Sequence, residues 1–149
     1  MAKKVKRAEA IESAAAPFAK CVGGVCDPER TQGLVAPVPT GPHTLVTLRG
    51  PGLFLGLEVT KQGGSSDLTF VILDIDGRNV TNLSYAAAAN SGLIQQNPYG
   101  LVLLQAAGLK TMTVGFPTPL VYKRQLVLSV GVNEPGVVQI VANVIHGSV

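Results

Sequence analysis

Short apolar runs that alternate with polar residues fill the chain from about residue 43 to its end. This alternation, rich in Val, Leu and Ile, predicts β-strands joined by turns, with one helical turn over residues 85–89. The expected strands span residues 44–48, 53–60, 68–75, 80–83, 101–104, 112–116, 120–122, 125–132 and 137–146. Because no helices alternate with these strands, we do not expect a nucleotide-type α/β fold. We therefore expect an all-β protein with an antiparallel β-sandwich, for which a jelly roll is one candidate topology.

Glycine and proline residues mark the turns and irregularities of these strands. Asp76-Gly77 follows a strong strand and predicts a tight turn. Gly56 predicts a bulge in the second strand, because glycine inside a strand pattern often marks an extra residue. Pro117 and Pro119 are expected to break the chain between two strands, since proline cannot donate a ladder hydrogen bond.

Few residues suggest catalytic or metal chemistry. Asp74 and Asp76 resemble the start of a calcium loop, but the acid that should follow about eleven residues after the first ligand is replaced by Tyr85. A plain turn is the better interpretation. His43 and His146 have no nucleophile at a recognised spacing and are expected to lie at the surface or in hydrogen bonds. With no serine elbow or phosphate-binding loop, we expect no enzyme, no cofactor and no metal site.

The first 42 residues differ in composition from the rest. Ala-rich residues 4–16 favour a short helix, which Pro17 would end. Residues 21–42 carry many glycines and prolines, a spacing that disfavours regular structure and favours an extended strap. We therefore divide the chain into an N-terminal arm, residues 1–42, and a β-sandwich domain, residues 43–149. We expect the arm to take a fixed shape only on another polypeptide surface.

The two cysteines, Cys21 and Cys26, lie in the sequence C-V-G-G-V-C. In a reducing cytoplasm free thiols are the first expectation. The glycine pair would let the loop close, so a disulfide formed late is the second alternative. Two thiols supply at most half of the ligands of a zinc site, so metal binding is the third alternative.

Charge is scarce and unevenly placed. Charged residues make up 14% of the 149 residues, against about 25% in a typical soluble domain. We therefore expect other subunits to cover part of the surface. The net charge of +3 reflects a basic start, formed by Lys3, Lys4, Lys6 and Arg7. That cluster is either a solvated terminus or a contact with an acidic surface or nucleic acid. The charges of the sandwich nearly balance, so we expect the sandwich itself not to bind nucleic acid, and nucleic acid is an unlikely partner of the chain.

From the sequence we expect no signal peptide and no membrane span. The basic start is not followed by an apolar run of the length that a signal peptide needs. No stretch approaches the roughly 18 consecutive apolar residues of a membrane span. We therefore expect synthesis in the cytoplasm and no membrane partner.

Three segments carry a resemblance to a known class of proteins. They are Leu68–Gly77, Val114–Leu120 and the turn Glu134–Gly136. In their general sequence pattern they resemble capsid decoration (cement) proteins of tailed phages and related small virion proteins of sandwich fold. The resemblance implies a homotrimer on the capsid surface, whose arms lie across subunits of the major capsid protein. It implies no catalytic residues, and the cysteine-containing strap has no counterpart in it.

Three hypotheses for the function follow. The first is a non-enzymatic decoration protein that binds and stabilises the assembled phage head. Its arm would supply electrostatic contacts and apolar anchors, for which the candidates are Lys3, Lys4, Val5, Lys6, Arg7, Ile11 and Phe18. The alternative is a tail- or fibre-associated binding module that recognises host surface glycans, although the lack of Trp counts against it. The third, an enzyme of sandwich fold, requires a convergent cluster of reactive groups that the sequence does not offer.

Overall fold

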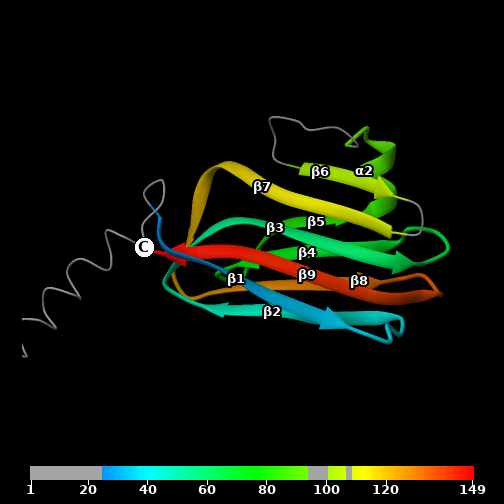
Figure 1. Ribbon diagram of the computed structural model, residues 1–149, viewed down its shortest axis with the longest axis horizontal. Helices are drawn as coiled ribbons and strands as arrows, with labels where there is room; N and C mark the ends of the chain where they lie inside the picture. Colours follow the sequence, from blue (N-terminus) through cyan, green and yellow to red (C-terminus); the bar gives the residue numbers. More distant parts are fainter. Residues whose placement is uncertain (1–24, 94–100, 107–108) are drawn as a thin grey trace, which may run out of the picture.

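A computed structural model describes residues 25–93, 101–106 and 109–149, with the side chains of 101–106 left out. The described part contains nine strands and one short helix (Figure 1). They are β1 (Cys26–Val35), β2 (Gly41–Arg49), β3 (Gly52–Gly63), β4 (Thr69–Ile75), β5 (Arg78–Ser84), α2 (Tyr85–Asn90), β6 (Leu101–Ala106), β7 (Leu109–Tyr122), β8 (Gln125–Val132) and β9 (Val137–Ser148).

The strands form two antiparallel sheets that pack face to face. The larger sheet has the order β1-β9-β3-β7-β6 and the smaller has the order β2-β8-β4-β5. The first four strands alternate between the sheets, and each pairs with a strand from the second half of the chain: β1 with β9, β2 with β8, β3 with β7, and β4 with β5. This nested pairing is the topology of a jelly roll, to which β6 adds an edge strand. The predicted all-β antiparallel sandwich is therefore confirmed.

Aliphatic residues from both sheets fill the space between them. Alternate residues of β8, from Leu126 to Val132, are completely buried, and β9 follows the same pattern from Ile140 to Val144. Residues of one strand that share a face point the same way, so this period of two places each apolar set inside. The predicted helical turn is also confirmed as α2, whose first backbone donors are capped by the Ser84 hydroxyl.

The irregular strap predicted for residues 21–42 is wrong for β1, which is a regular edge strand. β1 pairs with β9, and Pro28 lies at the register shift between Cys26 and Glu29, where no ladder donor is required. Gly33 allows close packing, because an added Cβ would lie 2.3 Å from the Leu45 carbonyl oxygen. The boundary predicted at residue 42 thus lies inside the sandwich, which already includes β1.

Cys26 begins β1 and is disulfide-bonded. The first expectation of a free thiol is therefore wrong at this position, and the disulfide that was left open as the second alternative applies. Cys21 lies outside the described residues.

The predicted break at Pro117 and Pro119 is also wrong, because β7 continues through both residues. Gly56 pairs with Gly115, whereas Phe54 pairs with Leu120, so residues 116–119 of β7 have no partner on β3. The prolines lie where the ladder is interrupted and no donor is needed. β7 curves in this region (Figure 1). Against β9, β3 has one extra residue between Phe54 and Gly56, so the predicted bulge is present next to Gly56, at Leu55.

Candidate functional site

The most concentrated polar chemistry in the described residues lies at the end of the sandwich where β3 ends and β9 begins. Lys61, the last inward-facing residue of β3, has a completely buried side chain. Its Nζ donates to Asp67 Oδ1 at 2.7 Å and to Glu134 Oε1 at 3.1 Å. Glu134, in the β8–β9 turn, is also completely buried. We call Lys61, Asp67, Lys110 and Glu134 the ionic cluster.

Glu134 holds three separate segments together. Its Oε1 accepts the backbone N–H of Asp67 at 3.2 Å, and its Oε2 accepts the Thr69 hydroxyl at 2.7 Å. A buried carboxylate is tolerated only when it is paired and hydrogen-bonded, as here. The carboxylate therefore joins the β8–β9 turn to the end of β3 and to the start of β4.

An aromatic ring covers the buried ammonium. Lys61 Nζ lies 5.3 Å from the centroid of the Tyr85 ring, within the range of a cation–π contact. The Tyr85 hydroxyl donates to the Val59 carbonyl oxygen at 2.6 Å. Burial, with a further contribution from the charges of Asp67 and Glu134, raises the pKa of Tyr85 far above its ordinary range. The hydroxyl consequently remains protonated and α2 is fixed against β3.

Asp67 links the buried part of the cluster to the surface. Its Oδ2 accepts from Lys110 Nζ, which is about one-third exposed. Partial burial acts to raise the pKa of Asp67, but hydrogen bonds from Lys110 and Lys61 and their charges outweigh it, so the net pKa is lowered. Asp67 is therefore an ionised bridge between two cations.

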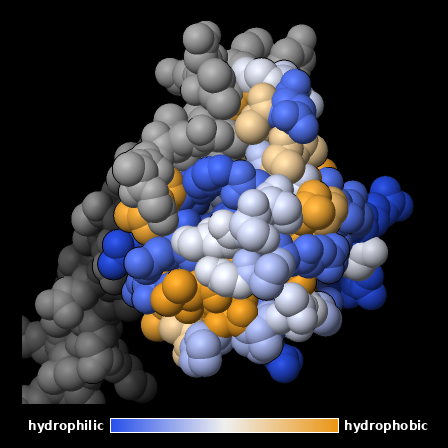
Figure 2. Space-filling model, turned by 90° about the vertical axis from the view of Figure 1, so that its right-hand side faces the viewer, coloured by the Kyte–Doolittle hydropathy of each residue, from blue (hydrophilic) through white to orange (hydrophobic). Residues whose placement is uncertain are grey.

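A shallow depression of about 180 Å³ opens beside the cluster. Its lining consists of Lys61, Gly63, Gly64, Ser65, Asp67 and Lys110. Gly64 has a φ of +101°, and an added Cβ would lie 1.9 Å from Glu134 Oε1. Figure 2 looks onto this end, where hydrophilic residues lie between separate hydrophobic groups. Because the charged groups bind one another, the arrangement is suited to fixing the loops of this end.

The opposite end of the sandwich is fixed by Asp76. Its carboxylate accepts the backbone N–H groups of Lys123 at 2.8 Å, Arg124 at 2.7 Å and Gln125 at 3.0 Å. These hydrogen bonds lower the pKa of Asp76. Asp76 and Gly77 have φ values of 52° and 79°, so the predicted tight turn is confirmed. The sequence did not indicate that the Asp76 side chain also ties this turn to the β7–β8 connection.

Both histidines make hydrogen bonds, as predicted. His43 Nε2 donates to the Pro39 carbonyl oxygen at 2.8 Å. The ring of His146 is largely buried, and its Nε2 lies 2.7 Å from Thr31 Oγ1. Within the described ranges, no three His, Cys, Asp or Glu side chains are grouped to hold a metal ion. No described helix is long and apolar enough to cross a membrane.

The arm residues predicted to bind a partner lie outside the described residues. They are Lys3, Lys4, Val5, Lys6, Arg7, Ile11 and Phe18. The sequence analysis did not predict the ionic cluster, because it considered only the net charge of the sandwich and not the position of each charged residue. One signal was available: Lys61 continues the inward alternation of Leu57 and Val59, which places its ammonium in the core.

Comparisons with known proteins identify the fold only. No protein-family model matches the chain, and no curated protein matches its sequence. Among solved structures, a chain in the acidic stable capsid structure of Helicobacter pylori bacteriophage KHP30 is similar at 13% identity and a TM-score of 0.52, over 80% of this chain and 86% of that chain. The jelly roll described above therefore also occurs in a chain of a phage capsid structure.

Two further structures are less similar. FlhE matches at 11% identity and a TM-score of 0.40, over 82% of this chain and 98% of that chain. A serine protease of Aeromonas sobria matches at 12% identity and a TM-score of 0.42, over 87% of this chain but 29% of that chain. At these TM-scores neither likeness bears on function.

Proposed function

We propose that this chain is a non-enzymatic structural protein of a phage virion, and that it decorates the assembled capsid. The observation that carries the proposal is the jelly-roll likeness to a chain of a phage capsid structure, which extends over 80% of this chain at a TM-score of 0.52. Jelly rolls are frequent in viral capsid domains. The low share of charged residues, 14%, supports a surface that other subunits cover in part.

The proposed mechanism is stabilisation of the shell by binding. A protein that binds only the assembled, expanded lattice stabilises that state by mass action. The partners are the major capsid protein and further copies of the chain, arranged as the homotrimer that the decoration-protein resemblance implies. The sandwich contributes a rigid body, because the buried Lys61–Glu134 ion pair fixes one end and the exposed Asp76 hydrogen bonds fix the other.

The arm is proposed to provide the second attachment point. Lys3, Lys4, Lys6 and Arg7 would contact acidic groups of coat subunits, and Val5, Ile11 and Phe18 would bury apolar surface between them. An arm tethered to a bound domain meets its site at a high effective concentration, which raises the overall affinity without a new domain.

The positions of two tyrosines count against the alternative of a glycan-binding module. Tyr85 and Tyr122 are 1% and 2% exposed. They therefore have no free ring face on which a sugar could stack.

Cosedimentation tests the proposal. The purified full-length chain is mixed with heads of the virus that encodes it, before and after expansion. We expect the chain to pellet with expanded heads up to a saturating number of copies, and to stay in the supernatant with unexpanded heads. Failure to bind heads in either state would overturn the proposal.

A further inference from the structure

The outer face of the larger sheet carries a patch of uncommon composition, which we call the β1–β9–β3 patch. It consists of Arg30, Leu34, Glu58, Val141, Asn143 and Ile145. The register shows that these residues share one face, because directly opposed residues in antiparallel strands point the same way. Leu34, Arg30 and the residue between them on that face, Gln32, oppose Val141, Ile145 and Asn143 in β9. Asn143 in turn opposes Glu58.

Hydrophobic side chains on this patch are unusually exposed. Leu34 is 60% exposed and Ile145 is 38% exposed, and Val141 lies half-buried between them on β9. Two further exposed hydrophobic residues lie outside this patch, namely Val138 near the start of β9 and Val149 directly after its end. Water therefore covers an apolar strip along two neighbouring strands, which the opposed pair Gln32 and Asn143 interrupts. Exposed apolar surface of this kind is a mark of a protein contact surface.

Two charges of opposite sign flank this strip. Among the described side chains on the outer face, only Arg30 and Glu58 are charged, and neither forms an ion pair with a described residue. Glu58 Oε1 accepts only the Asn143 amide, at 2.8 Å. Arg30 on β1 and Glu58 on β3 lie on either side of β9.

We propose that this patch receives a second copy of the chain, with Arg30 of one copy opposite Glu58 of its neighbour. The inference rests on the self-association in the proposed function. Because both copies use the same patch, this contact joins chains in pairs, and it is distinct from the contact between different patches that a trimer requires. The patch is complementary to itself: it offers one cation, one anion and an apolar strip between them. An acidic partner such as nucleic acid would match Arg30 but would be repelled by Glu58, whereas a second copy matches both.

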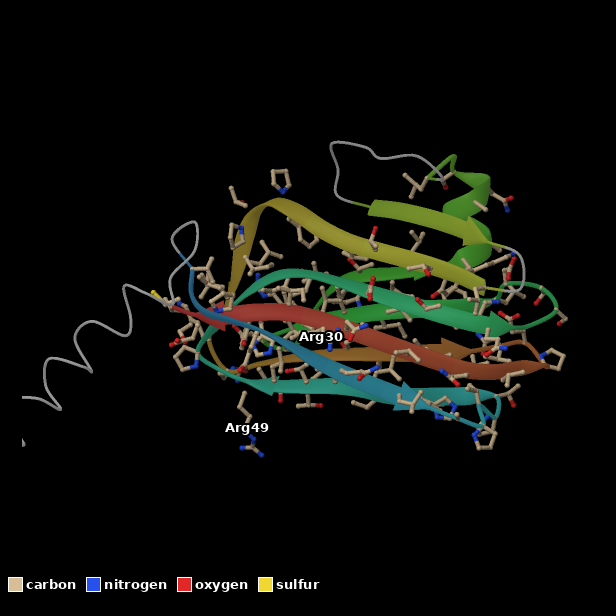
Figure 3. All side chains as sticks on the ribbon, in the orientation of Figure 1. Arg30 and Arg49 are labelled. Atoms are coloured by element: carbon tan, nitrogen blue, oxygen red, sulfur yellow. The ribbon has the colours of Figure 1, made fainter. Side chains whose placement is uncertain are left out.

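Figure 3 labels Arg30 and a second arginine, Arg49, which provides a matched control. Arg30 lies on the sheet that contains β1, whereas Arg49 extends away from β2, in the smaller sheet. Arg49 is also exposed and has no described ion pair. The change Arg49→Glu therefore alters the net charge as much as Arg30→Glu does, but on the other sheet.

Sedimentation equilibrium of the full-length chain, without any phage particle, tests the inference. We expect a self-associating protein whose dissociation constant rises at least about tenfold in Arg30→Glu and in Glu58→Arg, because each variant places like charges opposite each other. The double variant Arg30→Glu/Glu58→Arg should return to within about threefold of the wild type. Arg49→Glu should leave the constant unchanged, and circular dichroism should show all four variants folded. A monomeric wild type, or a double variant no stronger than the single ones, would overturn the inference.

Head binding by the same variants separates this inference from the proposed function. If Arg30→Glu binds heads poorly but self-associates normally, the patch contacts the shell and the inference is wrong, while the proposed function stands. If the charge-reversal pattern holds in solution but no variant and no wild-type chain binds heads, the inference stands and the proposed function is wrong.

Discussion

The buried ammonium of Lys61 lies 3.1 Å from the carboxylate of Glu134, so two opposite charges neutralise each other inside the sandwich. Lys61 is in β3 and Glu134 is in the turn between β8 and β9, far apart in the sequence. Their pairing joins the two sheets at one end. The pair is also coupled to α2 through Tyr85 and to the surface through Asp67.

Replacing Lys61 should destabilise the protein far more than replacing its exposed neighbour. Lys61→Met leaves Glu134 as a buried, uncompensated charge, for which we expect a loss of about 3–5 kcal/mol in the free energy of unfolding. Lys110→Met removes a partly exposed partner of the same Asp67 and should cost less than about 1 kcal/mol. Urea unfolding measures both, and similar losses would contradict the structure of the cluster.

Removing the second charge as well should restore part of this loss. In the double variant Lys61→Met/Glu134→Gln, no buried charge remains, and the amide oxygen can still accept from Thr69. We expect at least half of the lost stability to return relative to Lys61→Met. A double variant that is less stable than Lys61→Met would show that the two charges do not act as a pair.

Gly64 and Gly77 should differ sharply in their tolerance of alanine. Both have a positive φ, but an added Cβ at Gly64 meets Glu134, whereas at Gly77 nothing lies within 4 Å. Gly77→Ala should therefore cost about 1 kcal/mol for the backbone alone, and Gly64→Ala about 3 kcal/mol or more, because the cluster must also shift. Thermal and urea unfolding measure the loss of stability in each variant. Equal losses in Gly64→Ala and Gly77→Ala would argue against the close approach at Gly64.

Stability should fall in acid. Asp67 and Asp76 have ordinary pKa values of 3.8, and both pKa values are lowered in the folded protein. As the pH falls below about 4, the unfolded chain therefore binds more protons than the folded chain. The stabilisation that the two ionised carboxylates provide is complete above that pH, and it is lost as the pH falls through their lowered pKa values in the folded protein. The free energy of unfolding, measured with urea at several pH values, should change less steeply with pH in Asp67→Asn and in Asp76→Asn. An unchanged slope in both variants would contradict the assignment.

Two truncations should separate the arm from the fold. Deleting residues 1–20 removes every predicted arm contact and keeps both cysteines and β1, so we expect a folded protein that binds heads weakly. Deleting residues 1–35 also removes β1 and uncovers one edge of β9, so cooperative unfolding should be lost or strongly weakened. If the chain without residues 1–20 occupies heads as fully as the wild type, the arm contributes nothing to binding.

The sandwich could be predicted from the sequence because most of its strands bury one face. Leu126 to Val132 show that period clearly, and a strand with this pattern can be recognised without its neighbours. β1 could not be recognised, since it is an edge strand whose inward positions include Thr31 and Gly33 and whose start contains Pro28. In β1 the pairing with β9 overrides the local preferences of proline and glycine.

The ionic cluster could be anticipated only in part. The position of Lys61 in the alternation of β3 indicates an inward ammonium, but nothing local shows which acids would reach it. Asp67 reaches it through a left-handed backbone conformation, with φ of 59°, and Glu134 through the strand order of the jelly roll. Both depend on long-range topology, which hydrophobic periodicity does not encode.

Quantitative mass spectrometry of separated heads and tails, prepared from purified virions of the encoding virus, tests whether the chain is a capsid decoration protein. We expect the chain in the head fraction, at a fixed ratio to the major capsid protein. Finding it only in the tail fraction, or in neither fraction, would contradict a role as a capsid decoration protein.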